Sequence, residues 1–284
     1  MRTEASLAQK RVRLEQVLLE LGSLVVAYSG GVDSACLAVF AHRVLGLKAL
    51  AVTADSESLA SEQRELALEV ARRFGFAHRV VRTSEMANPL YVKNDADRCY
   101  HCKRELFRHL LPLAQAEGYA HLAYGLILDD LSDFRPGQRA AAEAGVKAPL
   151  AEAGLSKSEV RALSRELGLP TAELPATPCL ASRLPYGTPV TAEALRRVER
   201  AEAGLRALGF RELRVRHLGD RARVEIATLE LPRLEQAATR EAVLAAVREA
   251  GYTEVAVDPQ GYRRGRLNEA LPVVSVVGGS SGGI

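Results

Sequence analysis

The sequence predicts an α/β protein in which a doubly wound parallel sheet is followed by a smaller α+β domain. Over the first two-thirds of the chain, short apolar runs alternate with helical stretches of roughly 10 to 15 residues, and this alternation is typical of a parallel sheet. A cluster of prolines then precedes a segment with a hairpin pattern. With 284 residues, of which 48% are hydrophobic, the chain can bury the cores of two domains.

The first region supplies the elements of the parallel sheet. Apolar runs too short for helices predict the strands, and stretches with apolar residues at the helical period predict the helices. The predicted strands cover Leu24–Tyr28, Leu47–Thr53, Ala77–Arg82 and His121–Gly125. The predicted helices cover Ser34–Leu45, Glu62–Phe74 and Lys103–Glu117. Ligands of such sheets lie beyond the carboxyl ends of the strands, and we place this first domain at residues 1–185.

Prolines interrupt the regular pattern near the end of the first domain. They are Pro170, Pro175, Pro178, Pro185 and Pro189, with Gly187 among them. Since proline lacks a backbone donor and fixes φ, this segment is a linker or an active-site loop.

The second domain begins after these prolines. Thr191 is a suitable N-cap for a long helix that ends at Leu208. Two alternating runs joined by Leu218-Gly219-Asp220 then predict a hairpin. These runs are Glu212–His217 and Arg221–Ala227, and the last elements are a helix over Glu241–Ala250 and a strand over Glu254–Val257. We place this domain at residues 186–272 and expect a flexible tail over 273–284.

The segment Ser29-Gly30-Gly31-Val32-Asp33-Ser34 lies between the first strand and the first helix. Adjacent glycines let the backbone close around phosphate oxygens, and the helix N-terminus directs free N–H groups and its positive dipole end at the anion. The alternative is a glycine turn that only joins a strand to a helix. The segment resembles the signature of the PP-loop ATP pyrophosphatases, of the adenine nucleotide α-hydrolase-like fold. This resemblance implies that ATP is split to release pyrophosphate, with Ser29, Gly30, Gly31, Asp33 and Ser34 as phosphate-site residues.

Charge and cysteine usage limit the classes of partner. The formal net charge is +3, with acidic and basic residues mixed, so the sequence does not predict a stable complex with nucleic acid. The chain starts with a charged segment and has no apolar stretch approaching the ~18 residues of a membrane span, which favours a cytoplasmic protein with no membrane partner. Four cysteines without a signal peptide argue against a disulfide scaffold. Cys36, among apolar residues, is expected to be a buried thiol.

Three further cysteines are candidates for a shared metal site. Cys99 and Cys102 form a C-x-x-C pair, and Cys179 lies in the proline-rich segment. Two thiolates from one turn and a third from a remote loop leave one coordination position open. The residues alone leave zinc, an iron–sulfur cluster, a redox pair and incidental cysteines as alternatives.

Several motifs together resemble the LarE family, the ATP-dependent sulfur transferases of nickel-pincer nucleotide synthesis. They are Cys99-Tyr100-His101-Cys102-Lys103, Pro178-Cys179-Leu180-Ala181-Ser182-Arg183, Asp129-Asp130 with Asp133, Arg135-Pro136-Gly137, Gly261-Tyr262-Arg263 and Leu267-Asn268-Glu269. The resemblance implies that ATP adenylates a carboxylate of pyridinium-3,5-biscarboxylic acid mononucleotide and that sulfur then replaces AMP to give a thiocarboxylate. It also implies a homo-oligomer, whereas the sulfur donor is not indicated.

The LarE family contains two sulfur strategies. One form has a single cysteine, which corresponds to Cys179 and gives up its own sulfur to become dehydroalanine. The other has three cysteines and is similar to tRNA thiolases whose [4Fe-4S] cluster carries an additional sulfide. Because this chain has all three cysteines, the resemblance implies a [4Fe-4S] cluster on Cys99, Cys102 and Cys179, with Cys179 at the catalytic centre.

Acidic residues follow the predicted strands. Asp33, Asp129 and Asp130 are candidate Mg²⁺ ligands for the pyrophosphate that leaves, and Asp55 ends the second strand where a base or ribose could be held. The alternative is that Asp129 and Asp130 only cap a helix. The family commonly has Gly-Thr-Asn before the two aspartates, and Leu126 and Ile127 replace those polar residues here.

Arginines of the second domain are candidates for binding the anionic acceptor. Alternation places Arg214 and Arg216 on one face of their strand, and two guanidiniums on one face suit a phosphate or carboxylate. The alternative is a charged, solvent-exposed face of an edge strand. The family pattern pairs these arginines with Glu225, and Arg183 is a catalytic candidate because its loop also contains Cys179.

Two other functions compete with a LarE-like activity. A tRNA thiolase would adenylate a base carbonyl, but the chain has neither additional zinc-ribbon cysteine pairs nor a basic extension. A non-catalytic nucleotide-binding regulator would leave the cysteines and the aspartates without a role.

Overall fold

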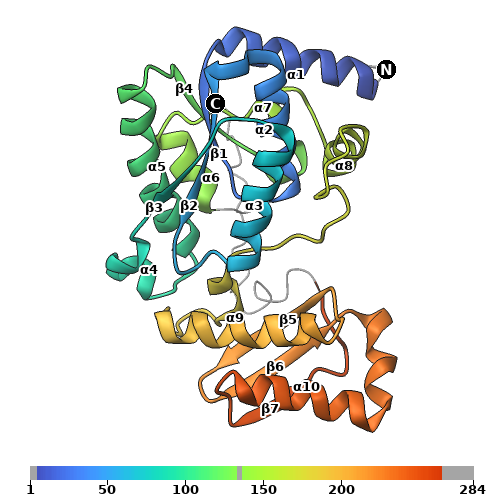
Figure 1. Ribbon diagram of the computed structural model, residues 1–284. Helices are drawn as coiled ribbons and strands as arrows, with labels where there is room; N and C mark the ends of the chain where they lie inside the picture. Colours follow the sequence, from blue (N-terminus) through green and yellow to red (C-terminus); the bar gives the residue numbers. More distant parts are fainter. Residues whose placement is uncertain (1–4, 133–135, 264–284) are drawn as a thin grey trace, which may run out of the picture.

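The computed structural model describes residues 5–132 and 136–263, which form two sheets with their helices (Figure 1). The first sheet is parallel, with four strands in the order β3-β2-β1-β4, and the second has three strands in the order β5-β6-β7. Asp133, Arg135, Leu267-Asn268-Glu269 and the predicted tail at 273–284 lie outside the described residues.

The first sheet contains β1 (Leu24–Ala27), β2 (Ala49–Asp55), β3 (His78–Arg82) and β4 (His121–Tyr124). The helices around it are α1 (Leu7–Leu21), α2 (Val32–Leu45), α3 (Ser61–Phe74), α4 (Pro89–Val92), α5 (Arg98–Ala116), α6 (Pro136–Glu143), α7 (Pro149–Glu152) and α8 (Lys157–Glu166). The short 3-10 helices in this part of the chain are η1 (Gly46–Lys48), η2 (Glu85–Ala87), η3 (Leu128–Ser132) and η4 (Leu180–Arg183).

Helices cover both faces of this sheet because alternate side chains of each buried strand point to opposite sides. Leu24 and Val26 of β1 pack in a cluster with residues of α1, α2 and α8. Val25 and Ala27 pack in a second cluster with residues of α5 and α6. Figure 1 shows these two groups of helices on opposite sides of the strands. The predicted doubly wound parallel sheet is therefore confirmed.

The second sheet has its own core. β5 (Leu213–Leu218) and β6 (Arg221–Ile226) form the predicted antiparallel hairpin, and β7 (Glu254–Val257) pairs with β6 in parallel. Apolar side chains of β5 and β6 pack against α9 (Ala192–Ala207) and α10 (Ala237–Glu249). A further 3-10 helix, η5 (Thr228–Glu235), joins β6 to α10. Thr191 caps α9 as predicted, since its Oγ1 accepts a hydrogen bond from the backbone N–H of Ala194 at 3.1 Å.

Several predicted boundaries differ from the structure, among them the starts of β2, α10 and α5. β2 starts at Ala49 because the preceding residues form η1, and α10 starts before the predicted Glu241. The third difference matters most for function: α5 starts at Arg98, not at Lys103. Cys99 and Cys102 therefore lie in the first turns of a helix and not in a loop, so the backbone fixes the direction of both side chains.

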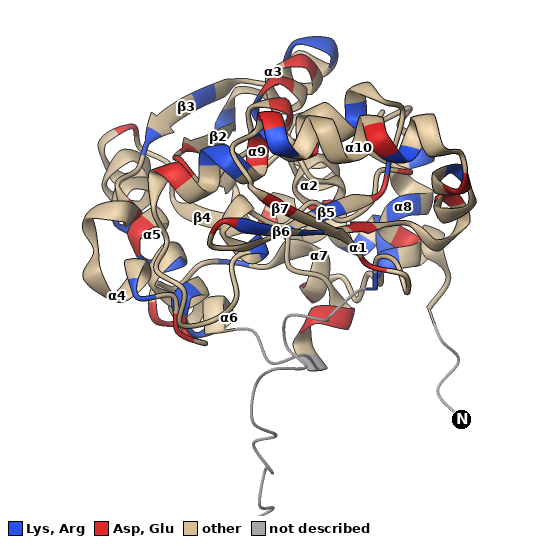
Figure 2. Cartoon of the chain, turned by 90° about the horizontal axis from the view of Figure 1, so that it is seen from below, with Lys and Arg blue, Asp and Glu red and all other residues tan. Residues whose placement is uncertain are grey.

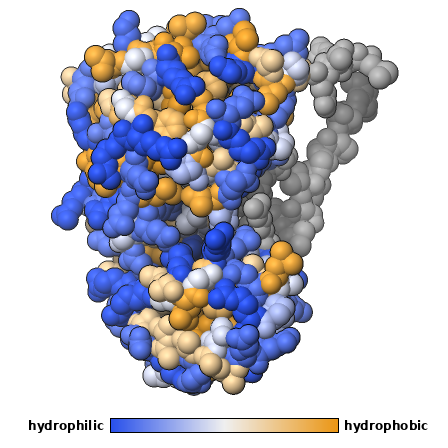
Figure 3. Space-filling model, turned by 45° about the vertical axis from the view of Figure 1, so that its right-hand side comes forward, coloured by the Kyte–Doolittle hydropathy of each residue, from blue (hydrophilic) through white to orange (hydrophobic). Residues whose placement is uncertain are grey.

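The surface has no segregation of charge in the views shown. Figure 2 shows basic and acidic residues interspersed on the helices, and Figure 3 shows a largely hydrophilic face with scattered hydrophobic side chains. Within residues 5–132 and 136–263, no helix combines the length and the apolar composition needed to cross a membrane.

Candidate functional site

The predicted phosphate loop is held in one conformation by its own hydrogen bonds and by α3. Ser34 Oγ accepts from the backbone N–H of Ser29 at 3.2 Å and donates to the carbonyl of Gly31 at 3.1 Å. Gly30 has a φ of +77°, and a Cβ at this position would lie 2.9 Å from the Cβ of Ala67 in α3. Gly31 is the N-cap of α2. The loop therefore places the N-terminus of α2 beside an exposed turn, as the motif predicts.

Gly125 brings the end of β4 against this loop. A Cβ on Gly125 would lie only 2.8 Å from the backbone nitrogen of Ser34, so only glycine fits. Leu126 and Ile127, which replace polar residues of the family pattern, are both buried. Ile127 packs in the same hydrophobic cluster as residues of α2.

Asp33 meets a lysine that the sequence analysis missed. Lys157, the first residue of α8, places its Nζ 2.8 and 2.7 Å from the two carboxylate oxygens of Asp33. The backbone N–H of Lys157 donates to Asp129 Oδ2 at 2.7 Å. The start of α8 thus joins the phosphate loop to the aspartate pair after β4. It also supplies a cation that the loop itself lacks.

The other predicted acidic residues also lie near the carboxyl ends of the strands. The carboxylate of Asp130 accepts from the backbone N–H of Ile127 at 3.4 Å, and Asp130 is buried. Asp55, at the end of β2, pairs with Arg64 at 3.4 Å. Among the residues that the structure describes, no three His, Cys, Asp or Glu side chains are grouped so that they could hold a metal ion. A Mg²⁺ site on Asp33, Asp129 and Asp130 therefore stays a prediction.

The three candidate ligand cysteines come from two segments that meet. Cys99 is exposed, whereas Cys102 and Cys179 are partly buried and pack against the same hydrophobic cluster. Each of these thiols is within electrostatic reach of the other two. Burial raises the pKa of the Cys102 thiol, and the carboxylate of Glu85 and the thiol of Cys179 raise it further. The thiols are neighbours, although the described residues do not form a closed metal-ligand group.

Glu85 is a buried carboxylate beside this thiol group. It accepts hydrogen bonds from Ser58 Oγ at 2.8 Å and from Thr83 Oγ1 at 3.0 Å. Cys36 lies elsewhere, fully buried in α2, where burial raises the pKa of its thiol to about 12. The prediction that Cys36 packs as a small apolar side chain is confirmed.

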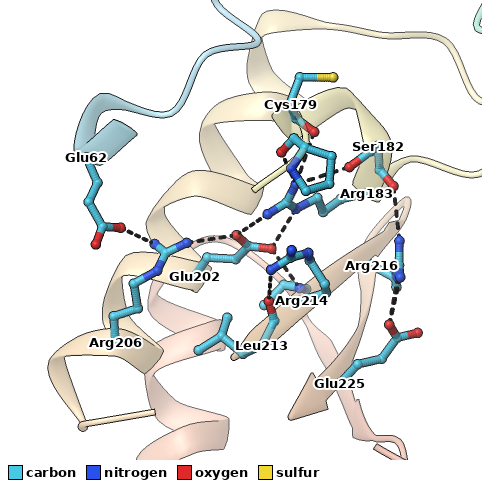
Figure 4. A network of polar contacts seen from close by, with 12 residues as sticks. Glu62, Cys179, Ser182, Arg183, Glu202, Arg206, Leu213, Arg214, Arg216 and Glu225 are labelled. Atoms are coloured by element: carbon cyan, nitrogen blue, oxygen red, sulfur yellow. Dashed lines mark hydrogen bonds and ion pairs between the residues drawn. The ribbon is translucent and has the colours of Figure 1, made fainter. Parts of the chain in front are cut away.

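Arg183 and Glu202 form a buried ion pair behind Cys179 (Figure 4). Two guanidinium nitrogens of Arg183 donate to the two carboxylate oxygens of Glu202 at 2.8 Å, and both side chains are 1% exposed. Burial alone would raise the pKa of Glu202, but the charge and hydrogen bonds of Arg183 hold it below its ordinary value. Arg183 also donates to the carbonyl of Cys179 at 3.1 Å. In Figure 4 the sulfur of Cys179 points away from these arginines.

β5 is an edge strand of its sheet, but Arg214 and Arg216 are buried, so the alternative of a charged, solvent-exposed face is wrong. Arg216 pairs with Glu225 at 2.8 Å and donates to the carbonyl of Ser182 at 3.0 Å. Arg214 donates to the carbonyls of Leu213 and Ala176, and its guanidinium lies 4.9 Å from the centre of the Tyr262 ring. Burial and the neighbouring Arg183 lower the pKa of Arg214.

Arg214 is bonded differently from the other two arginines of this cluster. Glu202 pairs with Arg183 and Glu225 with Arg216, whereas Arg214 makes no ion pair within the described part of the chain, although the charge of Glu202 acts on it. A buried guanidinium held by carbonyl oxygens and an aromatic face is suited to receive an anionic group.

Similar proteins are known for part of the chain and for nearly all of it. A profile of the asparagine synthase family matches residues 20–93, the part that contains the phosphate loop. An uncharacterized protein of Synechocystis sp. is 45% identical, over 93% of this chain and 99% of that protein. The pyridinium-3,5-bisthiocarboxylic acid mononucleotide synthase of Lactiplantibacillus plantarum is 35% identical, over 94% of this chain and 96% of the synthase.

The chain belongs to the LarE family. It is an enzyme, an ATP-dependent sulfurtransferase of the PP-loop class. One subunit of the glutamine-hydrolyzing GMP synthase of Archaeoglobus fulgidus is 28% identical over 52% of each chain. This more distant match agrees with a nucleotide-binding sheet shared beyond the LarE family.

In this LarE-family chain, the phosphate loop and the Cys179 loop both lie at the end of the parallel sheet where the strands have their carboxyl ends. The backbone N–H of Leu180, next to Cys179, donates to the carbonyl of Ser58 at 2.8 Å, and Ser58 follows β2. Sequence reasoning missed Lys157, Glu85 and Glu202, because none of them belongs to a local motif. The only local signal was Ser156, which caps the helix that Lys157 begins.

Proposed function

We propose that this protein adenylates a carboxylate of pyridinium-3,5-biscarboxylic acid mononucleotide with ATP, releases pyrophosphate and replaces AMP with sulfur to give a thiocarboxylate. The name of the synthase from L. plantarum supports this substrate. The observation that supports the proposal is the position of two loops beyond the carboxyl ends of neighbouring strands: the phosphate loop follows β1, and the Cys179 loop is bonded to the segment after β2.

ATP would bind with its phosphates on Ser29, Gly30, Gly31 and Ser34. Backbone N–H groups at the N-terminus of α2 suit the charge of pyrophosphate as it leaves. Lys157 adds a cation beside Asp33. Asp33, Asp129 and Asp130 are the proposed Mg²⁺ ligands or hold its water molecules, and Asp55 would contact the base or ribose.

The acceptor would bind at the arginine cluster. Arg214 is a buried cation that makes no ion pair with the described residues, so it suits a phosphate or carboxylate of the pyridinium nucleotide. Arg216 and Glu225 pair across the hairpin that contains Arg214, and Arg183 fixes the backbone of Cys179 through its carbonyl.

We propose that Cys99, Cys102 and Cys179 hold a [4Fe-4S] cluster. Their thiols are within electrostatic reach of one another, and thiolates suit both iron and zinc. Among the described residues no three side chains are grouped to hold a single metal ion, so the cluster is carried here by the proximity of the three thiols alone. When bound, such a cluster supplies an additional sulfide for transfer. We further propose a cytoplasmic homo-oligomer, with residues 1–185 and 186–272 as its two domains.

Anaerobic purification and cluster reconstitution, followed by parallel assays with the pyridinium dicarboxylate nucleotide and with tRNA, test the proposal. We expect ATP-dependent pyrophosphate release and thiocarboxylate formation with the nucleotide only. Cys179→Ala should keep pyrophosphate release and lose the thiocarboxylate, whereas Cys36→Ala, at a buried thiol outside the site, should keep both.

Activity on tRNA alone would show a tRNA thiolase. If neither the nucleotide nor tRNA leads to pyrophosphate release, a nucleotide-binding regulator is favoured. Stoichiometric conversion of Cys179 to dehydroalanine would contradict the cluster while leaving the adenylation step in place. Both steps are therefore tested separately.

A further inference from the structure

Two buried side chains join the segment after Cys179 to the start of the helix that contains Cys99 and Cys102. Asn94 has no exposed surface, and Arg98, the first residue of α5, is 3% exposed. Neither residue belongs to the phosphate loop or to the arginine cluster. The proposed function so far gives them no role.

Asn94 uses its polar groups on the proline-rich segment. Its Nδ2 donates to the carbonyl of Pro185 at 2.8 Å and to that of Thr188 at 2.7 Å. Its own carbonyl accepts from the backbone N–H of Gly187 at 3.0 Å, and its Oδ1 accepts from Arg98. The side chain therefore binds two points of the segment and the guanidinium at once.

The backbone of Asn94 adopts an unusual conformation. Its φ is +62°, and it is the one non-glycine residue with positive φ among residues 5–132 and 136–263. Side chains rarely adopt this region, and such residues persist where the surrounding contacts over-determine them. Here those contacts are the hydrogen bonds to residues 185–188.

Arg98 continues the connection toward Cys179. Its Nη1 donates to the carbonyl of Ala181 at 2.8 Å, and its guanidinium lies 5.9 Å from the centre of the Tyr186 ring. The charge of Arg98 acts on both Cys99 and Cys179. In the described part of the chain, Arg98 is the side chain of α5 that donates to the Cys179–Arg183 stretch.

We propose that Asn94 and Arg98 form a clamp that sets the distance between Cys179 and the C-x-x-C pair. Arg183 and Arg216 hold the other side of the same loop, through Cys179 O and Ser182 O. The clamp residues are positioning residues for sulfur transfer, an assignment that rests on the proposed function. The hydrogen bonds of the clamp do not depend on which reaction the three thiols carry out.

Disulfide formation measures this distance without substrate. The full-length protein, freed of metal by a chelator and then reduced and desalted, is treated with diamide, which oxidises two neighbouring thiols to a disulfide and is reduced to its hydrazine. Mass spectrometry of the peptides follows the bond between Cys179 and Cys99 or Cys102. We expect the bond to form in the wild type and at least about tenfold more slowly in Asn94→Gly and Arg98→Lys.

The two variants separate geometry from charge. Asn94→Gly keeps the positive φ and the guanidinium, whereas Arg98→Lys keeps a cation but loses the planar donor set. The matched control is Arg161→Lys, because Arg161 donates to the carbonyls of Ala172 and Leu174, which precede Cys179 in the same proline-rich segment. It should form the disulfide within about twofold of the wild-type rate.

Equal rates in the wild type and both clamp variants would overturn the proposal, as would an equally slow control or the absence of the disulfide in the wild type. A second measurement excludes a merely structural role. The clamp variants should keep pyrophosphate release within about threefold and lose at least about tenfold of thiocarboxylate formation. An equal loss of both steps, including loss through unfolding, contradicts positioning. If the wild type fails with the nucleotide, the proposed function fails, and the disulfide rates still report on the clamp.

Discussion

The phosphate loop and the arginine cluster both handle negative charge, but they do so in opposite ways. The loop is six consecutive residues that present backbone N–H groups next to an exposed turn. The cluster is made of side chains from α9, β5, β6 and η4 that are almost completely buried (Figure 4). Backbone donors need no compensating charge, whereas buried guanidiniums need carboxylates or carbonyl oxygens as partners. Changes in the loop should therefore affect catalysis first, and changes in the cluster should affect folding first.

The largest effect is expected for Glu202→Gln. Removal of one partner from a buried ion pair leaves the other charge uncompensated and costs about 3 to 5 kcal/mol, and Glu202 also pairs with Arg206 at 3.1 Å. Urea denaturation at pH 7 measures the loss. Glu193→Gln, on the same helix but with a side chain that is 67% exposed, should change the free energy of unfolding by less than about 1 kcal/mol.

The pH dependence of this difference has a defined sign. Because the pKa of Glu202 is lower in the folded protein than in the unfolded chain, its stabilisation is present above the unfolded pKa of about 4.3 and decreases as the pH falls through the folded pKa. The gap between wild type and Glu202→Gln should narrow below about pH 4.3. A gap that widens in acid would contradict the assignment of Glu202 as the ionised partner.

A smaller effect, on catalysis, is expected for Gly30→Ala. The new Cβ would lie 2.9 Å from Ala67 Cβ, at a φ of +77°, so the loop must move. We expect kcat/KM for pyrophosphate release to fall about 100-fold, since a displaced loop misaligns its donors. Gly75→Ala is the control: it has a similar φ of +69° at the other end of α3 but open space around it.

Comparable losses of pyrophosphate release in the two glycine variants would show that positive φ alone matters. The effect of Gly30→Ala would then come from backbone strain and not from the close approach of the loop to α3. A loss confined to Gly30→Ala supports the approach of the loop to α3 as the determinant.

The sheet was predictable because each of its elements is encoded locally. The apolar run at Leu24 gives β1, and the glycines that follow it give the loop. The start of α5 was missed, although Asp97 precedes Arg98 and Cys99 at the N-cap position. Their position depends on Asn94 and on the segment at 185–188, which lie far along the chain or outside the helix.

The sequence indicated candidate residues of the site but not their electrostatic surroundings. Arg183, Arg214 and Arg216 were found, but their burial was not, because alternation along a strand does not say which face is covered. The role of Glu202 could not be predicted from the sequence either. It is one of three glutamates on α9, and only the packing of η4 against that helix brings it to Arg183.

The smallest effect is expected for Lys157→Met. This substitution tests whether the phosphate loop depends on a side-chain charge, as the arginine cluster does. Lys157 Nζ lies 2.7 Å from Asp33 Oδ2, and the two side chains are 29% and 25% exposed. Loss of this cation next to the loop should raise KM for ATP about tenfold, the effect of one charge-assisted hydrogen bond of about 1.4 kcal/mol. Pyrophosphate release at varied ATP concentration measures it.

The chain offers a matched control for this substitution. Lys10 pairs with Glu159, also on α8, at 2.8 Å, with side chains that are 19% and 22% exposed. Lys10→Met should remove a comparable ion pair and leave KM for ATP within about twofold of the wild type. If both variants raise KM equally, Lys157 acts by holding α8 in place. If only Lys157→Met does so, the ATP site combines a motif visible in the sequence with a cation that only the fold supplies.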